Sequence, residues 1–284
     1  PAPCAPPDRS PTPLCSSTWR SLDGSCNNLR RSYQGSSGEP YVRLLPPEYG
    51  RGGSLRPGAW GSSLPSARTV SASLLSGDLG GGQTDGLSEH LMQWGQFVAH
   101  DLVNTPRASM DCCWRDRANT AACAPISVAR DDPVYRSRRV SCLPFVRSTL
   151  ACDQEQKNKA TAYLDASQMY GPKGETARTH FHGLLKDEVL EIEMEAQPPM
   201  QGPPCNPKID KHCFISGDDR INMTPGLAMT HTLWHREHNR LAKLLAKIQP
   251  GWKDEQLFQE ARAIVVAEVQ HITYNEYLPV VLGT

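Results

Sequence analysis

A histidine and an aspartate stand side by side in the stretch "MQWGQFVAHDL", at residues 92–102. The rest of the stretch is uncharged, and Gln96 precedes His100 by four residues, so on a helix these two side chains share one face. An imidazole held on a helix can take up a proton and return it, which is general acid–base chemistry. A single helical histidine is more often structural, so this stretch alone leaves both roles open.

Oxygen-bearing side chains recur at every second position in the stretch "ATAYLDASQMYG". Thr161, Asp165 and Ser167, together with the carbonyl of Tyr163, offer the hard oxygen ligands that a calcium ion prefers. The stretch holds only one carboxylate, so a calcium site needs a partner from elsewhere, and Asp101 is the candidate. The alternative is a helix N-terminus at which Asp165 and Ser167 cap free amide groups.

Two further stretches contain side chains that could take part in catalysis or bind a metal ion. In "SGDDRINMTPG", Arg220 comes just before a predicted helix start, a place where an arginine is most often an ordinary surface residue. In "HTLWHREH", His231, His235 and His238 follow the spacing i, i+4, i+7, so one helix face could present all three to a zinc ion. The stretch lacks the HExxH order of a zinc hydrolase, which weakens that interpretation.

The chain has ten cysteines, most of which fall in local groups within Gly-, Pro- and Ser-rich sequence. Short disulfide-closed loops account for this spacing and imply an oxidising compartment, either the secretory pathway or the extracellular space. Free buried thiols are the alternative, and the paired CxxC pattern of a structural zinc site is missing. Cys4 and Cys152 have no nearby mate. The expected groups are Cys15 with Cys26, Cys205 with Cys213, and Cys112, Cys113, Cys123 and Cys142 among themselves.

The elements that must hold these groups are mostly helices. One helix is predicted from about residue 85 to Pro106, and His100 is expected to face away from its core stripe. The clearest helix begins after Thr224, the predicted N-cap, with Pro225 in its first turn. Another is predicted from Asp254, as its cap, to about Tyr277. The expected core stripe of the first helix comprises Leu87, Leu91, Trp94 and Val98.

The remaining segments read as irregular structure. Residues 1–14 are rich in proline and predict a disordered arm, and residues 15–82 predict irregular chain wrapped on something larger. Residues 107–155 form a cysteine-rich segment outside the predicted helices, and a further helical region is predicted over about 155–195. No strand pattern of comparable length occurs. The predicted class is therefore mostly α, with long irregular loops closed by disulfides.

Composition excludes several classes of protein. Of 284 residues, 38% are hydrophobic and 21% charged, so a globular core is expected. Thirty basic residues balance thirty acidic ones, which gives no reason to expect nucleic acid or an anionic membrane as a partner. No apolar run approaches the ~20 residues of a membrane helix. The chain starts at Pro1 without a leader, so we expect a mature form or a fragment, with its oligomeric state open.

Four long stretches resemble, in order and with similar separations, the animal haem peroxidases, the superfamily of myeloperoxidase, lactoperoxidase, thyroid peroxidase and peroxidasin. They are "MQWGQFVAHDL", "TAYLDASQMYG", "SGDDRINMTPGLAMTHTLWHREHNRLA" and "EARAIVVAEVQHITYNEYLPVVLG". The earlier "LDGSCNNLRR" and "PYVRLLPPEYG" are similar too. The resemblance implies one haem peroxidase domain that begins near Cys15, in which the "HREHNRLA" helix is a packing feature.

The resemblance assigns roles to the residues singled out above. His100 matches the histidine above the haem iron, Gln96 its hydrogen-bonding companion and Arg220 the catalytic arginine. Such a site reduces hydrogen peroxide and oxidises a halide or a small organic electron donor. The imidazole moves a proton between the two peroxide oxygens, and the guanidinium stabilises the charge on the oxygen that leaves.

The resemblance also implies a calcium ion beside the haem site. An aspartate in the ligand set would fasten the distal helix to the oxygen-rich loop and so hold His100 in place, which accounts for the two adjacent residues. The positions that match the family's calcium ligands are Asp101, Thr161, Tyr163, Asp165 and Ser167.

Two departures from the family pattern affect these expectations. Vertebrate members esterify the haem to an aspartate and a glutamate, and here Ala99 and Met223 occupy those haem-binding positions, so we expect haem b without ester bonds. The family's proximal histidine lies beyond the "YLPVVLG" helix, and His271 does not match it. Residues 15–284 are therefore expected to be the N-terminal, distal part of the domain.

Two other classes of function compete with a peroxidase. A catalytically silent extracellular scaffold or adhesion protein could keep the fold, and the missing ester carboxylates favour it. Retention of His100, Gln96, Arg220 and the calcium positions opposes it. The other is a zinc hydrolase that uses the three histidines of "HTLWHREH".

Overall fold

The computed structural model has the predicted, mainly helical character. It describes residues 15, 18–51, 54–75, 86–108, 110–114, 120–152, 155–172, 214 and 216–283, without the side chains of 151 and 152. Three predictions lie outside the described residues. They are the proline-rich arm at 1–14, the pairing of Cys205 with Cys213, and the helical region beyond residue 172.

The described residues form two compact units. We call residues 15–39, 87–104 and 158–283 the helical unit, and residues 40–86 and 105–157 the hairpin unit. The expected single domain over residues 15–284 stays a prediction. Within the described residues, no helix is both long and apolar enough to cross a membrane.

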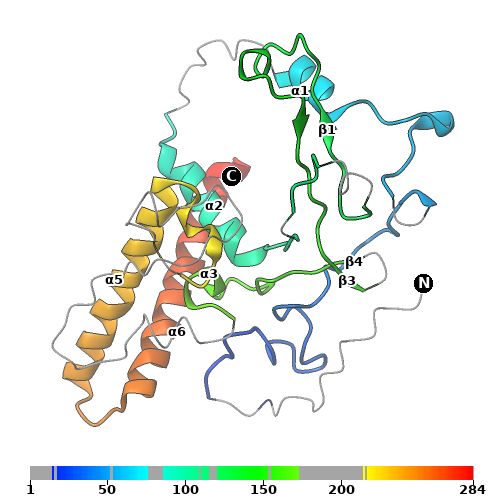
Figure 1. The fold of residues 1–284 in the computed structure, drawn as a ribbon. Coiled ribbons are helices and arrows are strands. Elements are labelled where there is room, and N and C mark those ends of the chain that lie inside the picture. Colours follow the sequence, from blue (N-terminus) through cyan, green and yellow to red (C-terminus); the bar gives the residue numbers. More distant parts are fainter. Residues whose placement is uncertain are drawn as a thin grey trace. The chain divides into compact units, whose positions relative to one another are not determined.

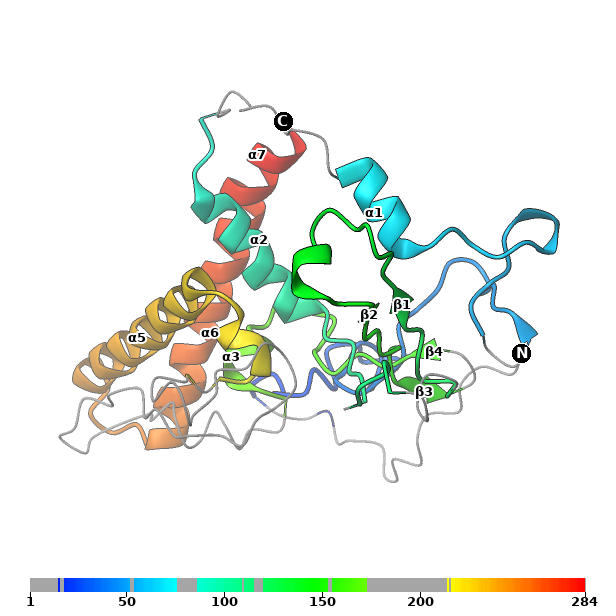
Figure 2. The same cartoon turned by 45° about the horizontal axis from the view of Figure 1, so that its top comes forward.

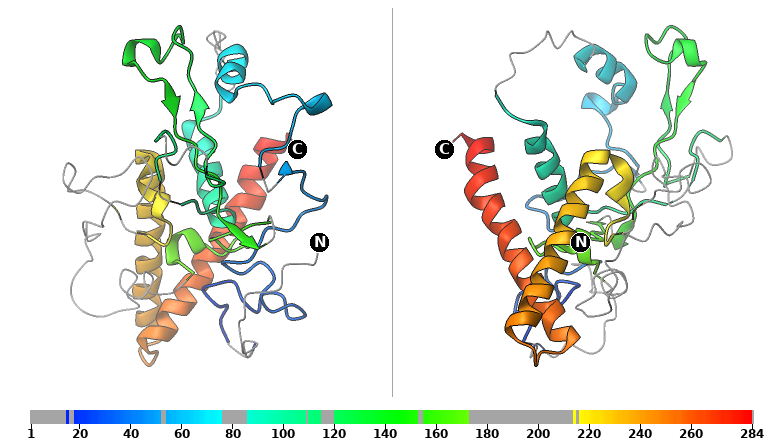
Figure 3. Two further views of the ribbon diagram at one scale, coloured as in Figure 1. Left: turned by 45° about the vertical axis from the view of Figure 1, so that its right-hand side comes forward. Right: turned by 90° about the vertical axis from the view of Figure 1, so that its left-hand side faces the viewer.

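The helical unit is built on two long helices that run antiparallel, side by side, as Figures 1 and 3 show. Shorter elements, among them a 3-10 turn (η4) and a π-helical turn (η5), complete it. Its elements are α2 (Glu89–Leu102), α3 (Ser167–Tyr170), η4 (Asp219–Met223), α5 (Pro225–Ile248), α6 (Asp254–Ile272), η5 (Thr273–Tyr277) and α7 (Leu278–Leu282).

Two helix starts test the capping predictions. Thr224 caps α5 as predicted, because its hydroxyl oxygen accepts a hydrogen bond from the amide of Leu227 at 3.2 Å. The predicted start of α6 at Asp254 is confirmed, but the predicted cap is wrong by one residue. Lys253 is the N-cap, and Asp254 is the first helical residue. The negative charge of Asp254 interacts favourably with the positive end of the helix dipole. The π-helical turn η5 comes just before Pro279, whose missing N–H interrupts regular α-helical bonding.

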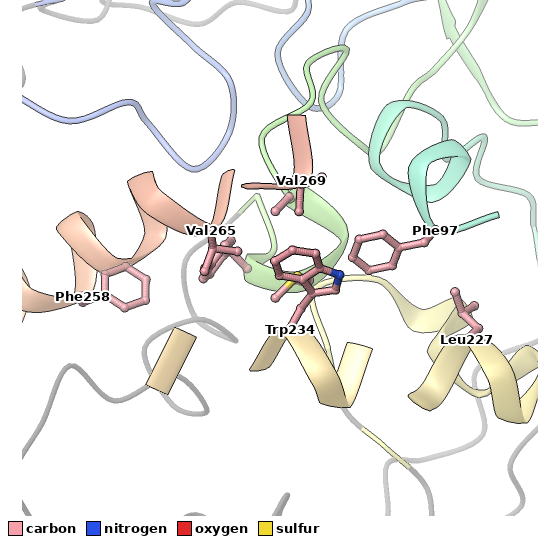
Figure 4. Close-up of a cluster of buried hydrophobic side chains, with 9 residues drawn as sticks. Phe97, Leu227, Trp234, Phe258, Val265 and Val269 are labelled. Carbon is pink, nitrogen blue, oxygen red and sulfur yellow. The ribbon is translucent and has the colours of Figure 1, made fainter. Parts of the chain in front are cut away.

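The core of the helical unit lies between α2, α5 and α6. Figure 4 shows side chains from all three helices in one cluster, with Trp234 of α5 between Phe97 of α2 and Val265 of α6, and with Leu227 and Phe258 at its two ends. Burial of each such side chain is worth about 1.5–3 kcal/mol. The full cluster is Phe97, Ala166, Met169, Tyr170, Leu227, Trp234, Phe258, Val265 and Val269.

The buried face of α2 differs from the predicted stripe. Leu87 lies outside the helix and is 55% exposed, and Leu91 and Val98 are only partly buried. His100 therefore lies on the buried face and not away from it. The prediction is wrong because this side of α2 meets the loop at 161–167 and Arg220, which contact Asp101 and the carbonyl oxygen of His100. The buried residues of α2 are Gln93, Phe97, His100 and Asp101.

The hairpin unit contains the expected irregular, disulfide-closed chain together with short elements that the sequence did not predict. The strands form two antiparallel pairs, β1 with β2 and β3 with β4. Residues 155–156, predicted as the start of a helical region, are the strand β4. The elements are η2 (Ala59–Gly61), α1 (Ala67–Leu75), β1 (Ile126–Ser127), η3 (Arg136–Arg138), β2 (Cys142–Leu143), β3 (Leu150–Cys152) and β4 (Glu155–Gln156); Figure 2 labels the four strands.

Three disulfides close loops within the two units. Cys15 pairs with Cys26 in the helical unit, as predicted. The group of four in the hairpin unit pairs within itself, as predicted, and the structure selects one of the three possible connectivities. The two bonds are Cys112–Cys123 and Cys113–Cys142.

Candidate functional site

The C-terminal turn of α2 gives His100 and Asp101 different surroundings, although both are buried. Their side chains are 6% and 0% exposed, respectively. Successive residues of a helix point about 100° apart. The carboxylate of Asp101 contacts the loop at 161–167, whereas the imidazole of His100 lies in the electrostatic field of Arg220.

Asp101 joins α2 to the beginning of α3. Its carboxylate accepts hydrogen bonds from the amides of Ala166 at 3.0 Å and Ser167 at 2.6 Å. The hydroxyl of Ser167 lies 3.0 Å from the carbonyl oxygen of Asp101 and 3.1 Å from its Oδ1. These contacts bridge more than sixty residues of sequence.

The other oxygen atoms of the predicted calcium set converge on the same place. The hydroxyl of Thr161 lies 2.7 Å from Asp165 Oδ1, 3.3 Å from the carbonyl oxygen of Tyr163 and 3.3 Å from Ser167 Oγ. Asp165 is 4% exposed, and its second oxygen, Oδ2, is buried without a hydrogen-bond partner in the part of the chain that the structure describes. All five predicted ligand residues therefore belong to one buried, oxygen-lined cluster.

The electrostatics of this cluster fit a bound cation. Burial raises the pKa of Asp101, and the nearby Asp165 raises it further. Burial also raises the pKa of Asp165, to about 6. Neither carboxylate has an ion pair among the described residues. The charge of Arg262 lowers the pKa of Asp165, but its guanidinium donates to the carbonyls of Arg20 and Ser21. A divalent ion would relieve both charges, and two carboxylates with hydroxyl and carbonyl oxygens form a suitable calcium ligand set.

The backbone around the cluster is fixed by close approaches. Ala166 adopts a left-handed conformation, with φ of 60°, and its amide and that of Ser167 both donate to Asp101. The hydroxyl of Tyr163 donates to the carbonyl of Gln34 at 2.6 Å. Gly35 has a φ of +78°, and a Cβ there would lie 2.9 Å from the Tyr163 ring. A glycine at this position lets the 18–39 segment pack directly on the cluster.

His100 has the electrostatic state that a proton acceptor needs. Burial, and then the positive charge of Arg220, lower its pKa to about 4, so the imidazole is neutral at pH 7. Its Nδ1 atom is buried and has no hydrogen-bond partner among the described residues. Gln96, one turn earlier on α2, is half-buried. The structure therefore puts both residues near one end of the same helix, as their spacing predicts.

Arg220 is held against the end of α2 by several bonds. Its Nη2 donates to the carbonyl oxygens of Val103 at 2.8 Å and His100 at 3.3 Å. Its Nε and Nη2 also donate to the two carboxylate oxygens of Asp218, at 2.8 and 2.6 Å. Such a two-point contact orients the planar guanidinium as well as pairing its charge.

Asp218 and Asn104 are functional candidates that the sequence reasoning missed. Asp218 is 3% exposed and also accepts hydrogen bonds from the Arg220 amide at 2.8 Å and from Asn104 Nδ2 at 2.9 Å. Burial disfavours its charge, but the bonds and charge of Arg220 outweigh that effect, and the pKa of Asp218 is lowered. The motif "SGDDR" contained the signal, because one of its aspartates stands two residues before the arginine.

An exposed, largely apolar stripe runs along α2 beside His100. Met92, Gln96, Ala99 and Val103 recur at three- and four-residue steps and so share one helix face. Met92 is 54% exposed, Val103 45%, and Met223 at the end of η4 46%. An apolar face with an imidazole and a guanidinium beside it fits the face of a haem. Ala99 and Met223 have no carboxyl group that could be esterified to one.

The three histidines of α5 have different partners, so they do not fit a zinc site. His231 Nδ1 lies 3.0 Å from Ser216 Oγ, and His238 Nδ1 lies 2.9 Å from the Tyr170 hydroxyl. His235 Nε2 instead contacts Asn239, one turn along the helix, at 3.1 Å. His231 and His238 are buried in the core, as a packing role requires.

Comparison with known sequences identifies one family over nearly the whole chain. Residues 19–284 match the family described as "Animal haem peroxidase". The chain is 38% identical over 312 residues to peroxidasin of Drosophila melanogaster, covering 96% of this chain and 20% of that protein. It is 37% identical over 303 residues to human eosinophil peroxidase, and the match covers 95% of this chain and 42% of that protein. The chain thus spans less than half the length of these curated relatives.

Solved structures agree on the fold. Peroxidase A from Dictyostelium discoideum superimposes with a TM-score of 0.73 and 25% identity, covering 93% of this chain and 53% of that one. A fatty acid alpha-dioxygenase from Oryza sativa gives a TM-score of 0.67 at 18% identity, and the match covers 94% of this chain and 39% of that one. At that identity the dioxygenase supports the fold alone.

Proposed function

The chain belongs to the animal haem peroxidase family, and we propose that it forms the side of a haem pocket where hydrogen peroxide is bound and cleaved. The observation that carries the proposal is the contact of Arg220 with the end of α2, beside a buried, neutral His100. Haem b would lie against the exposed stripe of α2 and η4. The residues proposed to border it are Gln96, Ala99, His100, Arg220 and Met223.

The proposed chemistry divides between the cofactor and the chain. Haem, when bound, would supply the redox chemistry that lets peroxide oxidise a halide or a small organic donor. His100 takes a proton from one peroxide oxygen and returns it to the other, so that the latter can leave as water. Arg220 stabilises the negative charge that develops on this oxygen. Gln96 completes the polar contacts around the peroxide.

We further propose a calcium ion in the oxygen-lined cluster of Asp101, Thr161, Tyr163, Asp165 and Ser167. Support comes from the two buried carboxylates without ion pairs and from the free Oδ2 of Asp165. The role of the ion is structural, because Asp101 belongs to α2 and the other ligands to the 161–167 loop. Binding would hold the helix, and with it His100, in position.

The proposed site of action is an oxidising compartment, either the secretory pathway or the extracellular space. The three disulfides of the described residues support this placement. A catalytically silent scaffold is the competing function, favoured by Ala99 and Met223, because neither side chain has a carboxyl group that could be esterified to haem.

One experiment separates the two functions. The full-length protein is purified with haem, and its Soret absorbance and peroxide-dependent oxidation of a dye are measured. A peroxidase shows both signals. A protein that folds, binds calcium and yet shows neither haem absorbance nor dye oxidation would establish the scaffold instead.

A further inference from the structure

The loop that joins β1 to β2 in the hairpin unit has two halves that differ in how they are held. The amide of Val128 donates to the carbonyl of Ser141 at 3.0 Å, and this bond closes the loop. Residues 129–140 form the loop itself, with the sequence "ARDDPVYRSRRV", and Figures 2 and 3 show it in green. It includes the short turn η3.

The first half of the loop is anchored through Asp132. Both carboxylate oxygens of Asp132 accept from the guanidinium of Arg68 on α1, one of them at 3.0 Å. Asp132 also accepts from the amides of Val134 and Tyr135 at 2.9 Å, and Arg68 stacks over the Tyr135 ring at 5.2 Å. The chain is therefore well fixed as far as Tyr135.

The second half carries three arginines without partners. Arg136, Arg138 and Arg139 are exposed, and among the described residues their guanidiniums make neither a hydrogen bond nor an ion pair. Their amides bond only within the loop, to the carbonyls of Asp132, Tyr135 and Arg136 at 3.1 to 3.2 Å. By contrast, Arg43, Arg68 and Arg240 all pair with carboxylates.

We propose that the peptide bond between Arg139 and Val140 is a processing site for a serine endoprotease that recognises clustered basic residues. The stretch "RSRR" puts positive charges at the first, second and fourth positions before this bond. Acidic pockets of a protease recognise such a pattern by charge complementarity. Exposed loop tips are also the places where native proteins are cleaved most readily.

The local structure can open at this bond at small cost. The bonds that must break are short-range, such as Arg139 N to Arg136 O at 3.2 Å and Val140 N to Tyr135 O at 3.4 Å. Arg139 also has a φ of 51°, in the left-handed region that only glycine adopts without strain. Hydrolysis adds one water across the bond, leaving a carboxylate on Arg139 and an ammonium group on Val140.

The two pieces would stay together after cleavage. Cys142 lies just beyond the new terminus and is bonded to Cys113, on the other piece. Strand β2 remains paired with β1, through Ile126 opposite Leu143 and Ser127 opposite Cys142. Processing would therefore convert one chain into two disulfide-linked chains without dismantling the hairpin unit.

Electrophoresis of the secreted full chain tests this proposal. Wild-type protein should run as one species without reductant and as two after reduction, and the second should begin with the sequence "VSCLPF". Arg139→Ala and Arg136→Ala should lower the rate of cleavage about tenfold or more, because each leaves an acidic pocket unfilled. Arg130→Ala, an exposed arginine of the same loop outside the pattern, should be cleaved like the wild type.

Addition of a purified basic-residue-specific protease to secreted protein gives a second measurement that does not depend on haem. A wild-type chain that stays intact while a control substrate is consumed would overturn the proposal. Cleavage that starts at another residue, or that Arg139→Ala leaves unchanged, would also overturn it. Retention on a sulfated-polysaccharide column that Arg136→Ala and Arg139→Ala abolish, in a chain that the protease does not cut, would instead assign the arginines to anion binding.

Discussion

A proton-transferring imidazole works where it is neutral and where a fixed positive charge lies close to the reacting oxygen. In this chain both conditions depend on burial. The low pKa of His100 comes from its burial and from Arg220, and Arg220 is in turn oriented by the buried carboxylate of Asp218. The action of His100 and Arg220 at the proposed site therefore also depends on Asp218, which would not touch peroxide itself.

Replacement of the proposed catalytic residues should slow the first reaction with peroxide in the haem-loaded, full-length protein. We expect His100→Ala to lower this rate by about 10²–10⁴-fold, the usual contribution of a positioned acid–base group. Arg220→Lys keeps the charge but loses the two-point contact with Asp218, so its loss should be smaller than that of Arg220→Ala. Stopped-flow absorbance at the Soret band measures the rate. His90→Ala, at the exposed start of α2, is the control, and a wild-type rate in His100→Ala with haem bound would disprove the assignment.

Asp218→Asn should impair the same step by misplacing Arg220. The variant removes the charge-assisted bonds to the guanidinium, each worth about 1.5–3 kcal/mol, so we expect a loss of about tenfold or more. In an Arg220→Ala background the same change should have little further effect, because the two residues act as one unit. Asp219→Asn, the exposed neighbour, is the matched control. Additive effects of the two substitutions would contradict the positioning role.

The haem should be held without ester bonds, because Ala99 and Met223 carry no carboxyl group. Acidified organic solvent should extract unmodified haem b from the purified full-length protein, leaving a colourless polypeptide. Mass spectrometry of both fractions makes the measurement. A haem that stays on the denatured polypeptide would show that another residue forms the link.

At the scale of elements, the oxygen-lined cluster joins α2 to the 161–167 loop, which lies more than sixty residues further along the chain. The 161–167 loop lies between Asp101 on one side and the glycine-containing 18–39 segment on the other. Gly95 of α2 plays a similar part on another side, since a Cβ there would lie 2.5 Å from the hydroxyl of Tyr277. The position of α2 is therefore set by contacts with several elements.

Calcium should stabilise this junction. A ligand that binds only the folded state raises the free energy of unfolding by RT ln(1 + [L]/Kd), so the melting temperature should rise with calcium and fall on chelation. Asp165→Ala should abolish the calcium-dependent shift, whereas Asp131→Ala, on an exposed loop, should keep it. Differential scanning calorimetry at several calcium concentrations measures the shift. An Asp165→Ala protein that melts higher with calcium, as the wild type does, would refute the ligand assignment.

At the scale of the whole molecule, two buried histidines link stability to pH. Burial lowers the pKa of both His231 and His238 to about 3. Unfolded histidines bind a proton below their ordinary pKa, while these two stay neutral in the folded chain until near pH 3. The unfolded state therefore binds more protons in this window, so their contribution to stability is complete above about pH 6.5 and falls as the pH is lowered.

The free energy of unfolding should thus decrease by about 1.4 kcal/mol per pH unit for each of the two histidines between pH 6 and pH 4. Denaturant unfolding at saturating calcium measures this slope. His231→Gln should reduce the slope by about 1.4 kcal/mol per pH unit, the contribution of one histidine. His90→Gln, which changes an exposed histidine, should leave the slope unchanged. A slope that His231→Gln does not alter would contradict the buried, neutral state of this residue.

Local sequence was sufficient for features that depend on neighbouring residues. The cap at Thr224 with Pro225 predicted the start of α5, and close cysteine spacing predicted the pairing of Cys15 with Cys26. The motifs around His100, Asp165 and Arg220 were enough to indicate the family. These features can be predicted from the sequence because a cap, a short disulfide loop or a motif is formed by residues a few positions apart.

Only the tertiary structure decided which groups are buried and which partners they meet. Helical periodicity put the core stripe of α2 on its most apolar face, whereas the structure buries Gln93, His100 and Asp101. Groups distant in sequence contact this face: the amide of Ala166 donates to Asp101, the hydroxyl of Thr224 lies 3.5 Å from Gln93, and Arg220 donates to the carbonyl oxygen of His100. The spacing of "SGDDR" could suggest Asp218 as a partner of Arg220, but not its contact with Asn104, which spans 114 residues. The partners of a buried polar side chain are often groups distant along the chain, and sequence spacing carries no information about where those groups lie.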